Sequence, residues 1–180
     1  MILLFDRLLR KITFVYRKYI FAKKTNTKHW QFKIRGPMTL LNNNVIIGQN
    51  VTFWPNVMLF GDGPIEIGNN VSIGNGTIIY SSKVGGVKIG SNTQIAAQCY
   101  IIDTDHGIKS GELIRNQQNA VDPVSIGEDC WLAEDVTVLK GSNIKNGAVI
   151  GAKSLVKGEI PGNSVCVGIP ARVIKYRDRK

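Results

Sequence analysis

The sequence predicts an all-β fold, a parallel β-helix of six-residue repeats with an amphipathic α-helix at its N-terminus. A large apolar residue returns every six positions, Gly or Ala often follows it, and the position four later holds a small or β-branched residue. A period of six fits neither the 3.6-residue turn of an α-helix nor the alternation of a simple strand. It fits a solenoid in which three short strands, joined by tight corners, form one coil of about eighteen residues.

The repeat covers residues 45–175 and predicts about five coils. Its large apolar residues should point to the axis and stack from coil to coil: Ile47, Phe53, Leu59, Ile67, Ile73, Ile79, Ile89, Ile95, Ile101, Ile126, Leu132, Val138, Ile144, Ile150 and Val156. The residues four positions later should fill the corners. Cys99 and Cys130 occupy such positions, so we interpret them as packing residues and not as nucleophiles.

Three breaks interrupt this rhythm. They lie between Leu59 and Ile67, between Ile79 and Ile89, and between Ile101 and Ile126. Subtracting the six-residue steps leaves insertions of 2, 4 and 19 residues. Each insertion follows the third repeat of a coil, so all three loops should leave the solenoid at one corner. The longest, at about residues 103–123, is the expected site-forming loop, because loops stacked on one edge are how a solenoid builds a binding site.

Residues 1–44 are expected to form a basic N-terminal arm, with an amphipathic helix over residues 2–22, and residues 176–180 a basic tail. Residues 1–35 hold ten Lys and Arg against one acid, Asp6, and so carry +9 of the net charge of +10. The apolar residues of the helix recur at steps of three and four: Phe5, Leu8, Leu9, Ile12, Val15, Tyr16 and Tyr19.

Two interpretations of this helix remain open. It lies on an anionic membrane surface, or it caps the open end of the β-helix against edge pairing. Capping explains the apolar stripe but not the cations, which favours the membrane. A nucleic-acid partner is not expected, because the rest of the chain offers no basic groove.

The cysteines and the N-terminus indicate a cytoplasmic protein. Cys99, Cys130 and Cys166 are odd in number and widely spaced, as expected for free thiols in a reducing compartment. The longest uncharged run near the start, Ile12–Tyr16, is too short for a secretory signal or a membrane span.

Three segments together resemble the hexapeptide-repeat acyltransferases, and among them the sugar O-acetyltransferases. They are IAAQCYIIDTDHGI (95–108), IGEDCWLAEDVTVLKGSNIKNGAVIGAKSLV (126–156) and GIPARVIK (168–175). The resemblance implies a left-handed β-helix and a homotrimer with active sites between neighbouring subunits. It also implies acetyl-CoA as co-substrate, no metal, and a saccharide acceptor. A lipid-linked precursor of a bacterial capsule, exopolysaccharide or O-antigen, at the inner face of the plasma membrane, would explain the basic arm.

The resemblance assigns the catalytic base to His106. Acetylating a hydroxyl requires removal of its proton during attack on the thioester, and imidazole titrates near working pH. A carboxylate would orient the ring, and the sequence offers Asp103 and Asp105 without choosing between them. Backbone N–H groups around Trp131–Ala133 are the expected donors to the oxyanion.

The resemblance also implies the residues that contact the two substrates. Those expected at coenzyme A are Ala133, Glu134, Gly151, Ala152, Lys157, Arg172 and Lys175. Gly151 and Ala152 would let the pantetheine arm approach the backbone, and the cations would meet phosphates. Glu134 departs from the small hydroxyl residue that relatives often carry, and Lys157 from a common Thr. Asn75 and Trp131 are expected beside the acceptor.

Other classes fit less well. Serine acetyltransferases need a long helical N-terminal domain, for which the chain has no room. β-Helical carbonic anhydrases need three zinc-binding histidines, and the chain has only His29 and His106. An amino-sugar N-acyltransferase remains an alternative. A non-catalytic β-helical scaffold would have no reason to keep the histidine loop, the Gly-Ala turn and the terminal Pro-Ala-Arg together.

Overall fold

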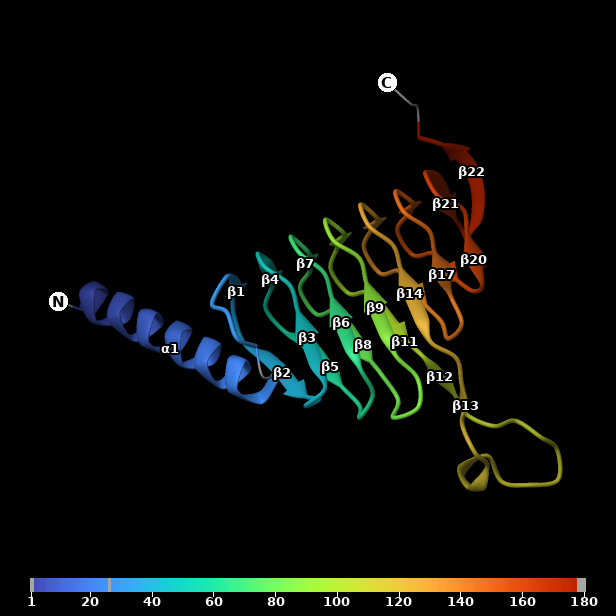
Figure 1. The fold of residues 1–180 in the computed structure, drawn as a ribbon, viewed down its shortest axis with the longest axis horizontal. Coiled ribbons are helices and arrows are strands. Elements are labelled where there is room, and N and C mark those ends of the chain that lie inside the picture. The colour runs from blue at the N-terminus through green and yellow to red at the C-terminus, as the bar shows by residue number, and fades with distance from the viewer. Residues whose placement is uncertain (1, 26, 178–180) are drawn as a thin grey trace.

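The computed structural model describes residues 2–25 and 27–177, with side chains from residue 12 onward. Helix α1 (Ile2–Thr25) is followed by a long three-sided prism of stacked short strands (Figure 1). The side chains of Phe5, Leu8 and Leu9 in the predicted stripe, and residues 178–180 of the predicted tail, lie outside this description.

Three sheets form the sides of the prism, and one strand of each belongs to every coil. Sheet 1 contains β1 (Phe32–Ile34), β4 (Val51–Phe53), β7 (Ser72–Ile73), β10 (Gln94–Ile95), β15 (Trp131–Leu132), β18 (Val149–Ile150), β21 (Ser164–Val167) and β22 (Arg172–Tyr176). Sheet 2 contains β2 (Met38–Leu41), β5 (Val57–Phe60), β8 (Ile78–Tyr80), β11 (Tyr100–Ile102), β16 (Thr137–Val138) and β19 (Leu155–Val156). Sheet 3 contains β3 (Val45–Ile47), β6 (Ile65–Ile67), β9 (Val87–Ile89), β14 (Val124–Ile126), β17 (Asn143–Ile144) and β20 (Glu159–Ile160). The strands pair in parallel, except that β22 returns antiparallel to β21.

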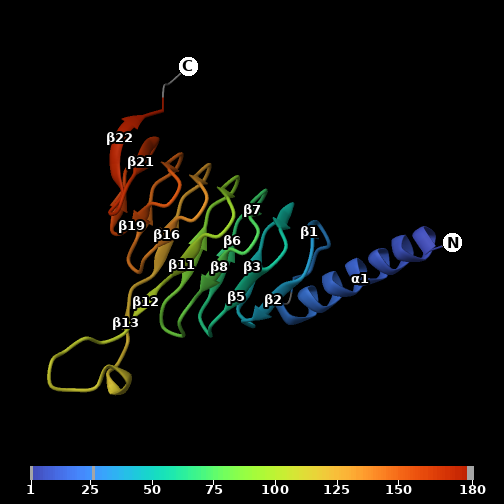
Figure 2. The same cartoon turned by 180° about the vertical axis from the view of Figure 1, so that it is seen from behind.

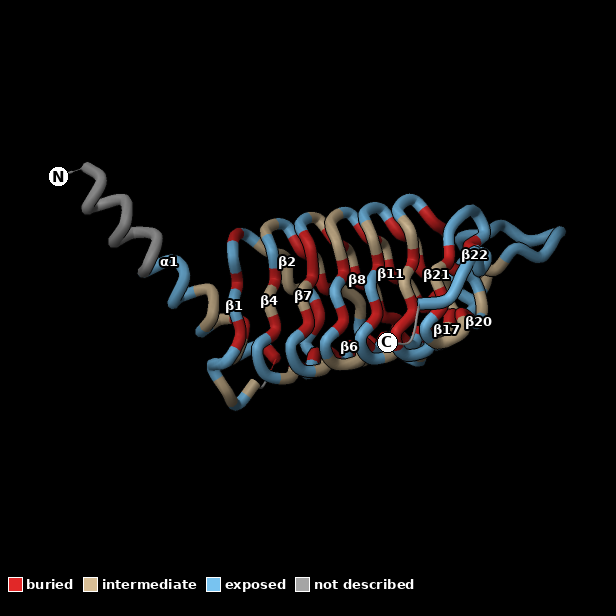
Figure 3. Tube along the Cα trace, turned by 90° about the horizontal axis from the view of Figure 1, so that it is seen from above, coloured by how far each residue is buried: buried red, intermediate tan, exposed pale blue. Residues whose placement is uncertain are grey.

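The predicted core stack is confirmed. Every large apolar residue of the repeat from Ile47 to Val156 is at most 6% exposed, and Figure 3 places the buried positions along the inside of the prism. Register joins equivalent positions, as in the row Ile73, Ile95, Leu132 and Ile150. Large residues thus meet large residues along the axis, which is why a six-residue period is sufficient to specify the fold.

The predicted corner residues are also buried, Cys99 and Cys130 among them. Burial raises the pKa of the Cys99 thiol to about 11 and raises that of Cys130. Both thiols are therefore protonated at neutral pH and poor nucleophiles, in agreement with a packing role.

The corner between sheets 3 and 1 turns on residues in the left-handed region. Asn50, Asn70 and Asn92 have φ of 58°, 57° and 62° there, a conformation that asparagine tolerates well. Their amides form a ladder, with Asn50 Nδ2 donating to Asn70 Oδ1 at 3.1 Å and Asn70 Nδ2 to Asn92 Oδ1 at 3.0 Å. This ladder fixes the pitch of the early coils on the outside, as the apolar stack does on the inside.

All three insertions leave the prism between sheets 2 and 3, as the spacing predicts. They connect β5 to β6, β8 to β9 and β11 to β14. We call this edge the second corner and the edge between sheets 1 and 2 the first corner. The longest insertion, residues 103–123, contains the short antiparallel pair β12 (Thr104–Asp105) and β13 (Ala120–Val121), and the turn η1 (Ile114–Asn116). We call it the histidine loop.

The β-helix begins earlier than the repeat indicates. Strand β1 pairs with β4 and β2 with β5, so the first coil starts at Phe32 and not at residue 45, and six coils are complete. Ile34 and Leu40 of this coil keep the six-residue spacing, but Arg35 follows Ile34 at a place where most later coils have Gly or Ala. An end coil has a neighbour on one side only, so its sequence is less constrained.

Helix α1 caps the open end of the prism with its C-terminal part. Phe21 is 2% exposed, and its ring centroid lies 5.2 Å from those of Phe32 and Phe53. Lys18 Nζ donates to the Trp30 carbonyl at 2.7 Å, and burial lowers its pKa. The N-terminal part of the helix projects beyond the prism (Figure 1). Among the described residues, no helix combines the length and apolarity that a membrane crossing requires.

Candidate active site

His106 lies in the histidine loop, directly after β12, and its side chain is exposed. The loop begins as a paired ribbon, with Thr104 opposite Val121 and Asp105 opposite Ala120. Farther out, the Gln117 amide accepts from the Lys109 N–H at 2.7 Å and donates to the Lys109 and Glu112 carbonyls, both at 2.9 Å. The loop that carries His106 is therefore an ordered arm projecting from the second corner (Figure 2).

Asp103 is fully buried at the base of this loop. Its carboxylate accepts from the Ser82 N–H at 2.8 and 3.0 Å, from the Gly86 N–H at 2.8 Å and from Ser81 Oγ at 3.1 Å. These donors belong to the 81–86 loop of the preceding coil. Asp103 therefore fastens two loops of the second corner together, and this arrangement does not support the expectation that it orients His106.

Asp105 is exposed, and its Oδ2 lies 3.8 Å from Lys140 Nζ. Across residues 2–25 and 27–177, no hydrogen bond or ion pair joins His106 to either aspartate. The part of Asp105 in orienting the imidazole stays a prediction.

A shallow depression of about 380 Å³ lies at the first corner. Trp54 and Trp131 stand among its walls, and Asn75 and the small residues Gly74 and Ala96 contribute to its floor. The two indoles are 46% and 52% exposed, high values for tryptophan. An open depression with two aromatic side chains and an amide suits a polyhydroxylated ring, which has an apolar face and hydrogen-bonding edges.

The expected oxyanion donors are already bound. The Trp131 N–H donates to the Ala148 carbonyl and the Ala133 N–H to the Ile150 carbonyl, both at 2.9 Å, as part of the ladder between coils. An amide held in this way cannot also point at a reacting carbonyl. The expectation that these two N–H groups donate to the oxyanion is therefore wrong. Even on an exposed face of a β-helix, the backbone N–H groups of the strands are hydrogen-bonded to the neighbouring coils.

The residues expected at coenzyme A form a column along the first corner. Ala133 and Glu134 follow β15, and Gly151 and Ala152 occupy the same place after β18. One coil farther, Val167 stands above Gly151 and pairs with Arg172 at the start of β22. A Cβ on Gly151 would lie 2.6 Å from Val167 Cγ1, so a larger residue here would require the Val167 side chain to shift.

Two of the three cations expected at coenzyme A adjoin this column. Arg172 and Lys175 are exposed on β22, where Arg172 Nη1 donates to the Ala171 carbonyl at 2.9 Å. Lys157 is exposed at the second corner, beyond β19. Exposed cations beside small residues fit the phosphates and the extended arm of coenzyme A.

The two groups of site residues lie on different edges of one prism. Asn75, Trp131 and most coenzyme residues belong to the first corner, whereas His106 and Lys157 belong to the second. The whole width of sheet 2, about 15 Å of extended chain, separates the corners. One chain therefore does not bring His106 to the depression that contains Trp131.

Trp54 was not among the sequence candidates, although the sequence carries a signal for it. It follows Phe53 in the repeat, at the place that holds Gly74, Ala96, Ala133 and Gly151 in the following coils. A tryptophan at this place breaks the small-residue rule. Its Nε1 donates to Ser72 Oγ at 3.1 Å, which fixes the orientation of the ring.

Comparison with known proteins gives the family. The chain is 37% identical over 153 residues to the Escherichia coli K12 protein WbbJ, whose name assigns it to O-acetyl transfer in lipopolysaccharide biosynthesis; the match covers 79% of this chain and 77% of WbbJ. The chain belongs to the hexapeptide-repeat O-acetyltransferases. WcaF of the same organism, named for colanic acid biosynthesis, is 35% identical over 131 residues, or 73% of this chain and 69% of WcaF. None of the family models compared with the chain matches it.

A solved structure shares the fold of this O-acetyltransferase. AntD, an N-acyltransferase from Bacillus cereus in complex with dTDP and 3-hydroxybutyryl-CoA, superposes with a TM-score of 0.74 at 21% identity, over 83% of this chain and 81% of AntD. In the described part of the chain, no three metal-ligating side chains gather.

Proposed function

We propose that this O-acetyltransferase acetylates a hydroxyl group of a saccharide, with His106 as general base. The imidazole takes the proton of the hydroxyl while the oxygen attacks the thioester carbon of acetyl-CoA. The tetrahedral intermediate then expels the thiolate of coenzyme A, which receives the proton from the imidazolium. The products are an acetyl ester and free coenzyme A.

The observation that carries this proposal is the histidine loop itself. It holds His106 on an ordered ribbon away from its own prism, and its outer part exposes Ile108, Leu113 and Ile114 by 84%, 67% and 56%. Apolar side chains at this exposure mark a surface that another molecule covers. A second copy of the chain would cover them and bring its own first corner to His106.

This pairing of edges gives a homotrimer with three equivalent sites. In each site, one subunit supplies His106 and Lys157 from its second corner. The next subunit supplies Trp131 and Asn75 from its first corner. A closed ring of three prisms satisfies the same contact three times and leaves no histidine loop uncovered.

Acetyl-CoA would lie along the first corner, between the two subunits. Its pantetheine arm passes Ala133, Gly151 and Ala152, where small side chains leave the backbone accessible, and it passes Glu134 beside them. Its phosphates meet Arg172 and Lys175, with Lys157 reaching them from the other subunit. The acetyl group then ends near Trp131, facing His106.

The acceptor would occupy the depression between Trp131 and Trp54, with Asn75 as a hydrogen-bonding partner. Relatives named for lipopolysaccharide and colanic acid biosynthesis support a precursor of a bacterial surface polysaccharide as the acceptor. Such a precursor is attached to a lipid at the inner face of the plasma membrane.

Contact with that membrane would come from the N-terminal arm, in a cytoplasmic protein. The capping part of α1 leaves Ile12, Val15, Tyr16 and Tyr19 between 52% and 61% exposed. Lys23, Lys24 and Lys28 are exposed beside them. An apolar stripe with neighbouring cations is the surface that an anionic bilayer binds.

The test is acetyl-CoA turnover against a panel of saccharides, with product mass spectrometry and with the His106→Ala and His106→Asn variants. Ester formation by the wild type and a loss of roughly 10²–10⁴ in kcat for both variants are expected. Near-normal kcat in both variants would remove His106 from the mechanism. An amide product would favour N-acylation instead.

A further inference from the structure

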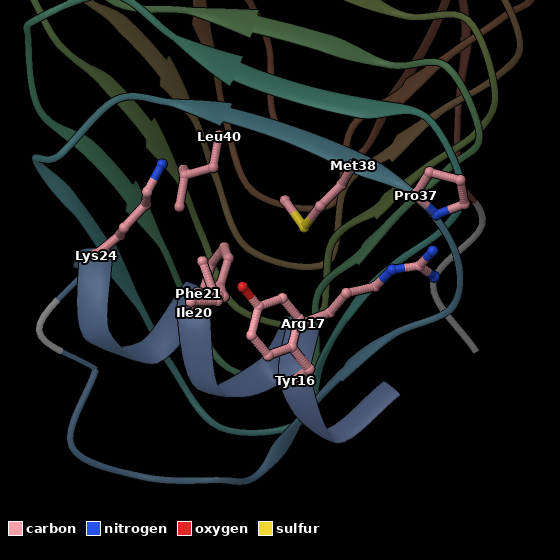
Figure 4. Close-up of a pocket in the computed structure, with 8 residues that line it drawn as sticks. All are labelled: Tyr16, Arg17, Ile20, Phe21, Lys24, Pro37, Met38 and Leu40. Carbon is pink, nitrogen blue, oxygen red and sulfur yellow. The ribbon is translucent and has the colours of Figure 1, made fainter. Parts of the chain in front are cut away.

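A cavity of about 310 Å³ lies between α1 and strand β2 (Figure 4). Ile20 and Phe21 line it from the helix, and Met38 and Leu40 line it from the strand. Strand β2 ends sheet 2, so no further strand closes this side. The capping contact of Phe21 fills the axis of the prism and leaves this apolar space beside it.

Two cations border the apolar space. Arg17 and Lys24 are seven residues apart, on the same helix face as Ile20 and Phe21. Among the described residues, no carboxylate forms an ion pair with either of them. In Figure 4 they stand at opposite ends of the cavity, with the Tyr16 hydroxyl between them.

The neighbouring Lys18 shows what a capping cation does in this helix. Its Nζ donates to the Trp30 carbonyl and lies 4.9 Å from the ring centroid of Phe32. Arg17 and Lys24 make no such contact with the prism. Arg17 is half-buried and Lys24 is exposed, so both cations remain accessible to a ligand at the mouth of the cavity.

The surroundings show from where a ligand would enter. Tyr16 also borders a second, almost wholly apolar depression, together with Ile12, Val15, Tyr19 and Trp30. The exposed stripe proposed above to contact the membrane is thus continuous with the mouth of the cavity. A molecule reaching the cavity from the bilayer would carry an apolar chain and present an anionic group to Arg17 and Lys24.

We propose that this cavity binds the phosphate headgroup of a membrane lipid. The long side chains of Arg17 and Lys24 turn inward from the two ends of the cavity to form charge-assisted hydrogen bonds to the phosphate, and Tyr16 donates its hydroxyl. The first carbons of the lipid chain pack on Ile20, Met38 and Leu40. The proposal rests on the membrane contact of the N-terminal arm proposed above, and it adds a preference for lipids with an accessible phosphate monoester.

The test uses the full chain and phosphatidylcholine vesicles that contain phosphatidic acid or phosphatidylserine, matched in surface charge. Matching the charge removes the general attraction of cations, which is about 1 kcal/mol for each Lys or Arg near the surface. The wild type is expected to bind the phosphatidic acid vesicles about tenfold more tightly, through charge-assisted bonds that phosphatidylserine cannot supply equally.

Two double variants each remove two positive charges, one pair at the cavity and one pair away from it. Arg17→Gln with Lys24→Gln should abolish the preference, so that the ratio of the two affinities falls to about one. Lys23→Gln with Lys28→Gln removes two exposed cations of the same region that do not line the cavity, and should keep the ratio. Met38→Trp fills the cavity without changing charge and should also abolish the preference. Acetyl transfer to a water-soluble saccharide checks that each variant is folded.

If the ratio of the two vesicle affinities fell equally in both double variants, the proposed lipid site would be wrong. It would also be wrong if the wild type bound both kinds of vesicle equally. In both cases the membrane contact itself would stand. A wild type that binds neither vesicle would overturn the membrane contact, and the lipid site with it. If inorganic phosphate, at the concentration of the lipid phosphate, abolished the preference, the site would bind free phosphate and the assignment to a lipid would be wrong.

Discussion

The Ser82 N–H donates hydrogen bonds to both carboxylate oxygens of Asp103, at 2.8 and 3.0 Å. Asp103 is the first residue of the histidine loop, and Ser82 belongs to the shorter loop of the preceding coil. On the other side, the Asp122 N–H donates to the Asp103 carbonyl at 3.0 Å. The two ends of the histidine loop and its neighbour are thus joined at one buried residue, which fixes where the loop leaves the prism.

Replacing Asp103 with Ala should therefore reduce stability. The change leaves the Ser82 and Gly86 N–H groups without their acceptor, at a cost of about 3 kcal/mol, whereas the Ser81 hydroxyl can still donate to the Pro64 carbonyl at 3.0 Å. For a chain of this size, we expect Tm to fall by about 6–12 °C in thermal unfolding. Asp105→Ala is the control, and it should change stability by no more than about 0.5 kcal/mol, because its ion pair is exposed. If Asp103→Ala kept its Tm but lost kcat as His106→Ala does, Asp103 would act in the chemistry.

Alkaline pH should destabilise the protein partly through Cys99. Burial raises the pKa of this thiol from 9.0 to about 11 in the folded chain, so thiolate formation favours the unfolded chain. The contribution of the thiol to stability is complete below pH 9 and is lost as the pH rises through 11. Urea unfolding at pH 8 and pH 10 should show that the wild type loses about 1 kcal/mol more than Cys99→Val between the two values. Identical losses would contradict the raised pKa.

Gly151→Ala separates packing from coenzyme binding. The added Cβ meets Val167 Cγ1, and we expect a loss of about 1–3 kcal/mol. Val167→Ala in the same chain removes this clash and should restore most of the stability. The KM for acetyl-CoA should stay raised in the double variant, because the methyl group still occupies the path of the pantetheine arm. If this KM equalled that of Val167→Ala alone, Gly151 would serve packing only.

Trp54→Ala should weaken the binding of the acceptor and leave the binding of acetyl-CoA unchanged. Loss of one aromatic wall of the first-corner depression is expected to raise the acceptor KM about three- to tenfold, with the KM for acetyl-CoA unchanged. Steady-state kinetics with any saccharide that is turned over measures both. Trp30→Ala is the matched control, since Trp30 is 51% exposed but lies beside α1. Equal effects of the two changes would remove Trp54 from the acceptor site.

The repeat was sufficient to predict the core and the position of the loops. In a solenoid, each place in the repeat meets the same surroundings in every coil, so the apolar row from Ile47 to Val156 follows from spacing alone. The first coil was not predicted because it lies at an end, where Leu40 is only partly buried and Arg35 stands at a place that holds Gly or Ala in most later coils. Similarly, α1 combines a buried Phe21 with an exposed Ile12, and a sequence pattern does not show where along a helix the contact ends.

The candidate site was predictable in its residue types but not in its contacts. The insertion of 19 residues marks the histidine loop, whereas the partners of Asp103 lie 17 to 22 residues away in another loop, and two of them are backbone groups. The prediction that the Trp131 and Ala133 amides donate to the oxyanion was wrong for a related reason. The pattern of side chains does not show which backbone N–H groups are already hydrogen-bonded to the neighbouring coil.

In the proposed trimer, each active site combines the second corner of one subunit with the first corner of the next. Trimers formed from His106→Asn chains alone, or from Trp131→Ala chains alone, should be nearly inactive. Co-refolding the two in equal amounts tests the claim, because some sites then receive an intact histidine from one chain and an intact tryptophan from its neighbour.

The measurement is the acetyl-CoA turnover of this mixture relative to wild-type trimers. Random assembly gives each shared site a chance of about one quarter to be intact, so we expect recovery to about a quarter of wild-type activity. If every site lay within one chain, the mixture would be no more active than the average of its two parents, and that result would rule out a site shared between subunits.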